Sequence, residues 1–122
     1  MDRHGPIMVT VNTPVTDEQI QQLAATGMPF SAALLWWGPN RHMDGAEAIE
    51  LEHQRRMVSL HATGVIAVLC PAQSDKLAGV AVMTASSDEA RAVMDGDPCV
   101  QAEMMNCDVY PVIGFPGDAL PG

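Results

Sequence analysis

The chain has 122 residues, of which 48% are hydrophobic and 17% charged, so it has the composition of a single globular domain and not of a disordered chain. Its formal net charge is −9, from 15 acidic and six basic residues. A surface of that charge repels phosphate backbones and anionic lipid, so we expect neither a nucleic-acid partner nor a membrane role.

The cysteines and the absence of cofactor motifs narrow the chemistry further. Cys70, Cys99 and Cys107 are an odd count without a CxxC pair, which is typical of reduced thiols in the cytoplasm. No apolar run is long enough for a membrane span, and the first residues lack the layout of a signal peptide. The sequence contains no phosphate loop, dinucleotide fingerprint or metal-ligand cluster. We therefore predict a cytoplasmic protein that uses no metal and no cofactor.

Residues 1–29 differ in character from the rest and are predicted to form an extension. β-Branched residues dominate Ile7–Val11, which indicates a short strand. Thr16 followed by Gln19 is a capping-box signature, and the apolar stripe behind it predicts a helix. Gly27-Met28-Pro29 ends that helix, because proline cannot continue it.

The first strand and helix of the main domain come next. Phe30–Trp37 is apolar almost throughout and is followed by the turn residues Gly38-Pro39-Asn40, which is typical of a strand covered on both faces. Ala46–Thr63 has helical periodicity, since its apolar residues recur every three or four positions. Gly64 is expected to end this helix.

Two strands and a second helix follow. Val65–Cys70 and Leu77–Thr84 are predicted strands, separated by a polar turn. A second capping box, formed by Ser86 and Glu89, opens a helix, and Gly96-Asp97-Pro98 breaks it.

The last part of the chain returns to the sheet. We predict a short turn of helix that ends at Ala102, and then a fourth strand over Asn106–Ile113. Residues 115–122, rich in Gly and Pro, are expected to form a tail.

The predicted order of elements over residues 30–114 is βαββαβ, which matches the ferredoxin-like sandwich of an α+β domain. In that topology the first and third strands are central, and these are the two runs without polar alternation. Two helices cover only one face of such a sheet, so the other face needs a cover. A second copy of the chain is the commonest cover, and we predict a homodimer, with the extension over 1–29 as a rival.

His53 is the most informative single residue. It lies in the middle of the apolar stripe of the first long helix, between Ile49 and Met57. An imidazole among aliphatic groups needs a hydrogen-bond partner, and a core histidine bonded to a backbone carbonyl is the more common case. Such a residue is also a candidate general acid/base, because imidazole exchanges its proton near neutral pH.

Asp97 is the second candidate. It lies at a helix exit before Pro98, where an aspartate often does no more than cap the next helical turn. The predicted topology brings the end of the second helix and the first helix to the same side of the sheet. Asp97 is therefore also a candidate partner that orients His53 and stabilises its protonated form, although the spacing leaves open whether the two touch.

Candidate substrate-binding residues come from strand ends and from the inward sides of the helices. Trp36 and Trp37 lie on opposite faces of a regular strand, so one is expected to wall a pocket and the other to lie in a subunit contact, with two core aromatics as the alternative. Cys70 ends the second strand and is more often a buried small residue than a nucleophile. The candidate set is Trp36, Trp37, Met57, Cys70 and Met94.

Several stretches resemble the YCII-related family of small ferredoxin-like proteins. The resemblance extends from about Phe30 to Gly114, and its most characteristic part is a helix followed by Asp-Pro and a hydrophobic residue. The stretches that carry it are Glu52-His53, Leu60-His61-Ala62-Thr63-Gly64-Val65, Leu69-Cys70-Pro71, Ser87–Val100 and Asp108-Val109-Tyr110-Pro111-Val112.

The resemblance implies a dimeric α/β-barrel type of protein whose pocket holds a His–Asp pair, which maps to His53 and Asp97. Members are similar to muconolactone-isomerase-like and other cofactor-independent barrels, and the family's known activity includes elimination of chloride from a hydroxylated chloroaromatic. Two positions depart from the family pattern. Glu50 stands where members often have Arg, which argues against an anionic substrate, and Cys70 stands where members often have Gly, which places a thiol near the pocket.

Our leading hypothesis is a cofactor-independent acid/base enzyme, a lyase or isomerase of the dehydrochlorinase-like kind. It would act on a small cyclic or aromatic metabolite by elimination, isomerisation or cyclisation, with His53 as the acid/base and Asp97 as its orienting partner. Two alternatives stay open, a non-catalytic protein that binds a small ligand and a cofactor-free monooxygenase of the dimeric α/β-barrel type.

Overall fold

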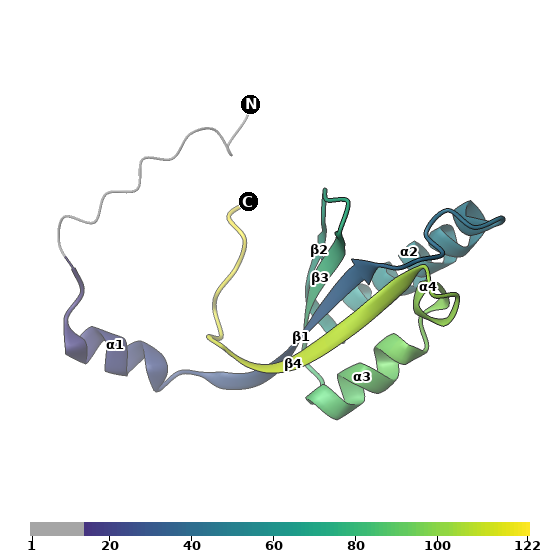
Figure 1. Cartoon of the computed structure of the whole chain (residues 1–122). Helices are drawn as coiled ribbons and strands as arrows, with labels where there is room; N and C mark the ends of the chain where they lie inside the picture. Colours follow the sequence, from purple (N-terminus) through teal and green to yellow (C-terminus); the bar gives the residue numbers. More distant parts are fainter. Residues whose placement is uncertain (1–13) are drawn as a thin grey trace.

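The computed structural model describes residues 14–122 (Figure 1), and the strand predicted over residues 7–11 lies outside them. The elements follow one another as α1 (Asp17–Ala24), β1 (Met28–Trp37), α2 (Ala46–Ala62), β2 (Ile66–Pro71), β3 (Leu77–Met83), α3 (Ser87–Asp95), α4 (Pro98–Gln101) and β4 (Met105–Gly114). No helix of the described chain is both long and apolar enough to cross a bilayer.

The strands form one sheet of four strands in the order β2-β3-β1-β4, and every neighbouring pair is antiparallel. This α+β arrangement is compatible with a ferredoxin-like fold, and the prediction that the first and third strands are central is confirmed. Helices α2, α3 and α4 lie together on one side of the sheet (Figure 1).

Local signals in the sequence explain where the helices begin and end. The Thr16 hydroxyl accepts the N–H of Gln19 (3.2 Å), and the Gln19 side chain accepts the N–H of Thr16 (2.8 Å), so the predicted capping box is formed. The Ser86 hydroxyl caps α3 in the same way by accepting the N–H of Glu89 (3.2 Å). Gly64 follows α2 with φ +83°, a left-handed conformation that glycine adopts without a Cβ clash.

The core between the sheet and its helices is built largely from methionine. Its fully or almost fully buried members include Met57, Met83, Met94, Met104 and Met105. Flexible thioether side chains fill irregular gaps, which suits a core with few aromatic residues.

Strand β1 shows how the sheet separates its two faces. Ser31, Ala33 and Leu35 are buried under the helices, whereas Leu34 and Trp36, which alternate with them, are half-buried on the opposite face. We call this second surface, which none of the three helices covers, the open face. The central strands contribute apolar residues to it, among them Ala32, Leu34, Trp36 and Val82, so the expectation that the helices leave the other face of these two strands uncovered is confirmed for the described chain.

The start of β1 and the end of β4 form a two-stranded arm that carries α1 away from the rest of the chain (Figure 1). β1 begins at Met28, two residues before the predicted start, and Pro29 pairs only toward β4, because the pairing with β3 starts at Ser31. A proline is tolerated there since it lies outside the fully paired part of the sheet. Helix α1 has no buried residue.

Candidate functional site

His53 projects from the middle of α2 toward the layer between helices and sheet. Met57, one turn further along the helix, is buried, and Ile49 and Leu60 pack against the core, so the predicted apolar stripe is confirmed. The side chain of His53 is only 12% exposed. Its ring nitrogens therefore depend on protein or ligand partners and not on bulk water.

Asp97 is completely buried at the start of α4. Its Oδ2 accepts the backbone N–H groups of Cys99 (3.0 Å) and Val100 (3.4 Å), and Pro98 occupies the first helical position. The capping role predicted from the sequence is confirmed. A fixed cap also holds the carboxylate in one orientation.

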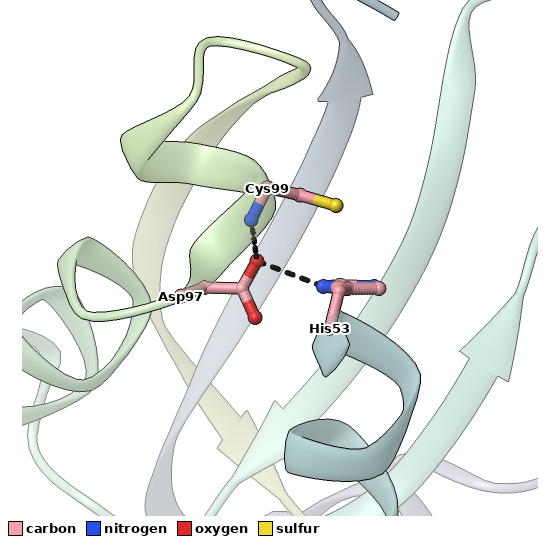
Figure 2. Close-up of side chains that lie close together, drawn as sticks. All are labelled: His53, Asp97 and Cys99. Carbon is pink, nitrogen blue, oxygen red and sulfur yellow. Dashed lines mark hydrogen bonds and ion pairs between the residues drawn. The ribbon is translucent and has the colours of Figure 1, made fainter. Parts of the chain in front are cut away.

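The same Oδ2 of Asp97 lies 2.8 Å from Nδ1 of His53 (Figure 2). Because Oδ2 already accepts two N–H groups, we assign the proton to Nδ1 of His53, which donates it to the carboxylate. The capping and orienting interpretations of Asp97 therefore hold together. This tautomer leaves the lone pair on Nε2, the nitrogen on the other side of the ring.

Arg56 is a third member of the cluster, and the sequence interpretation missed it. Its Nη2 donates to the carbonyl of Val93 (2.7 Å), and its Nη1 lies 3.8 Å from Oδ1 of Asp97. Both Nη1 and Oδ1 are buried and have no hydrogen-bond partner among residues 14–122. Arg56 thus supplies a positive charge beside a buried carboxylate. One signal was present, because Arg56 stands three residues after His53 and so lies on the same side of the helix.

Cys99 completes a group of three potential metal ligands with His53 and Asp97, whose ligand atoms lie within 4.8 Å of one another. Burial, followed by the nearby carboxylates of Asp97 and Glu50, raises the pKa of the Cys99 thiol to about 12. A metal prefers thiolate, and Oδ2 of Asp97 already has three donors. This donor set fits proton transfer by His53 better than metal binding.

A cavity of about 250 Å³ opens beside His53, between α2 and the ends of β2 and β3. Its walls are mostly apolar and include Leu35, Met57, Leu69 and Met105. Of the candidate substrate-binding residues, Trp37, Met57 and Cys70 line it together with His53. Cys70 is exposed, so the interpretation of it as a buried small residue is wrong, because it lies near the end of an edge strand. Asp97 is not among the residues that line the cavity, so His53 connects the buried carboxylate to a space large enough for a small molecule.

The structure places the other two candidates outside this cavity. Trp36 lies on the open face, where its Nε1 donates to Oδ2 of Asp108 (3.0 Å). Met94 is completely buried in the core under α3. Trp37 walls the cavity, as was expected of one of the two tryptophans, whereas the subunit contact expected for the other stays a prediction.

Comparison with protein-family models finds none that matches this chain, and comparison with curated proteins finds none either. The chain is therefore described by its own fold and site. It is an α+β protein with a four-stranded antiparallel sheet and a buried His–Asp contact beside an apolar cavity.

Proposed function

We propose that this protein is a cofactor-independent acid/base enzyme that acts on a small cyclic or aromatic metabolite. His53 is the general base and acid, and Asp97 orients it. The observation that carries the proposal is the 2.8 Å contact between Nδ1 of His53 and Oδ2 of Asp97, at the wall of an apolar cavity. A base held in one tautomer at the wall of a mostly apolar cavity is suited to removing a proton.

The reaction follows from what the residues are able to do. Nε2 of His53 takes a proton from the substrate, and the imidazolium that forms is stabilised by the Asp97 carboxylate. Arg56, whose Nη1 lies 3.8 Å from the other oxygen, adds a positive charge beside that carboxylate. The proton then returns to another atom of the substrate or leaves with a departing group. Return of the proton to the substrate gives isomerisation or cyclisation, and loss of a departing group gives elimination.

Proton exchange with deuterated water tests the proposal on surrogate substrates. Small cyclic carbonyl compounds and chlorinated phenols serve as probes, with deuterium incorporation measured by NMR and chloride release measured in solution. We expect His53→Gln to lower the rate about 100-fold or more, as is typical of a lost general base. Asp97→Asn should lower it too, because the amide carries no charge to stabilise the imidazolium.

His61→Gln is the matched control, because His61 lies exposed on the same helix, away from the cavity. It should leave the rate unchanged. Undiminished turnover in His53→Gln would show that another group is the base and would refute the proposal.

A non-catalytic ligand-binding protein is the second candidate. It is favoured by the apolar cavity walls and by Met57 and Met105 among them, since methionine adapts to different ligand shapes. In that case a ligand bound in the cavity would be recovered chemically unchanged, without deuterium, after incubation with the protein.

We also propose that the chain is related to the YCII-related family and works as a homodimer of the dimeric α/β-barrel type. The element order and the contact between His53 and Asp97 support the first part, since both agree with what the resemblance implies. The uncovered apolar face of the sheet supports the second. Three unpaired cysteines agree with a reducing compartment such as the cytoplasm.

A further inference from the structure

The charged residues around the cavity beside His53 restrict the class of ligand that it can bind. Among the described residues that line it, none is Lys or Arg, and Glu50 is the carboxylate among them. The guanidinium of Arg41 stacks on the ring of the lining residue Trp37, 4.0 Å from its centroid, and forms no ion pair with Glu50. Arg56, on the same helix, directs its guanidinium to the carbonyl of Val93 and to Asp97. The Asp97 charge is thus balanced within the protein, whereas the Glu50 charge is not.

Glu50 is half-buried on α2, one turn before His53. The ion pairs within residues 14–122 are His53 with Asp97, Arg56 with Asp97, Arg55 with Glu52, and Arg91 with Asp95. Glu50 takes part in none of these pairs and in no side-chain hydrogen bond of the described chain. A carboxylate partly removed from water, with no partner and with apolar walls beside it, favours the arrival of a cation.

We propose that the cavity takes a small apolar molecule that carries a protonated amine, with Glu50 as the carboxylate that receives it. This inference rests on the proposed function, which makes this cavity the substrate site, and it adds the chemical class of the substrate. The apolar body of the ligand lies against walls such as Leu69 and Met105. Its ammonium group lies at the half-buried carboxylate of Glu50.

The positions of Glu50 and His53 also locate the reacting atom. Residues three apart on a helix are neighbours on its surface, so a nitrogen held by Glu50 lies close to the ring of His53. The proton that His53 removes would then come from an atom near the amine nitrogen. A carboxylate ligand, in contrast, would place like charges side by side.

Three probes that share one ring separate charge from shape: benzylamine, benzyl alcohol and benzoate. Binding of each to the full chain at neutral pH is followed by NMR, through the indole signal of Trp37 and the signals of His53. We expect benzylammonium to bind about tenfold more tightly than benzyl alcohol, as for a charge-assisted hydrogen bond partly exposed to water. Benzoate should bind most weakly.

Glu50→Gln should remove this preference for the amine while the fold is retained. Glu52→Gln is the matched control, because Glu52 is on the same helix but is 60% exposed and paired with Arg55. It should leave the order of the three probes unchanged.

The inference is overturned if benzoate binds the unmodified chain as tightly as benzylammonium, if Glu50→Gln keeps the preference, or if none of the three probes binds. These outcomes are distinct from failure of the proposed function. If the three probes bind in the expected order but turnover survives His53→Gln, only the acid/base role of His53 is refuted. If the order of binding is reversed but turnover requires His53, only the preference for an amine ligand is refuted.

Discussion

Asp97 combines two structural roles in one oxygen atom. Oδ2 caps α4 through two backbone N–H groups and also accepts the proton of His53. Because the helix cap fixes the carboxylate, the hydrogen bond to that carboxylate also fixes the orientation of the imidazole. Asp97→Asn is for this reason a cleaner test of the charge than Asp97→Ala, because the amide oxygen still accepts from the helix start.

The three cysteine thiols are expected to differ in reactivity. Burial raises the pKa of Cys107 to about 11, against the lowering effect of Arg91, and the pKa of Cys99 is raised to about 12. The thiolate is the reactive form, so at about pH 8 both thiols stay protonated and only the exposed Cys70 reacts with Ellman's reagent.

Titration of the native protein should accordingly count one reactive thiol, and titration after unfolding should count all three. Reactivity of the two buried thiols should increase only as the pH rises toward the raised pKa values. A Cys70→Ser variant that still reacts rapidly at about pH 8 would contradict this assignment.

At the scale of elements, the boundaries of α2 determine where the site stands. Gly64 lets the chain turn immediately after the helix, at φ +83°, and a Cβ at this position would meet no neighbouring atom within 4 Å. Any penalty for alanine there is therefore a backbone penalty alone.

We expect Gly64→Ala to lower the free energy of unfolding by about 1–2 kcal/mol, measured by urea denaturation, because alanine is strained in the left-handed region. Gly122→Ala at the chain end is the control, since its backbone needs no positive φ. Equal stability of the Gly64 variant and the unmodified chain would mean that the turn rearranges without cost.

At the scale of the whole molecule, the sheet has one face under α2, α3 and α4 and one face without helices (Figure 1). The open face carries Leu34, Trp36 and Val82 from the two central strands. The arm of β1 and β4 carries helix α1 beyond the four-stranded part of the sheet. No residue of α1 is buried. Short isolated helices are marginal in water, so both features favour association with a second copy.

The proposed homodimer is tested by substitution in the middle of the open face. Leu34→Asp should convert a dimer into a monomer, because it places a carboxylate inside the apolar contact. Leu51→Asp is the control, since Leu51 is 52% exposed on α2, on the other side of the sheet. Light scattering after size exclusion measures the mass, and a monomeric unmodified chain at micromolar concentration would contradict the dimer.

The sequence alone was sufficient for the order of elements between Phe30 and Gly114 and for most of their ends. Capping residues, glycines and apolar periodicity act over a few neighbouring positions, and Thr16, Ser86 and Gly64 end or begin helices where they were expected to. The two central strands were likewise recognisable, because burial on both faces removes polar alternation.

Only the tertiary structure decided the site. His53 and Asp97 are 44 residues apart in sequence, and their 2.8 Å contact depends on how α2 and α4 pack against one sheet. Packing also brings Arg56 to Asp97 and separates Met94 from the cavity. A pattern along the chain reports which side of its own element a residue faces. It does not report which distant residue will lie opposite, because that depends on the relative placement of two elements.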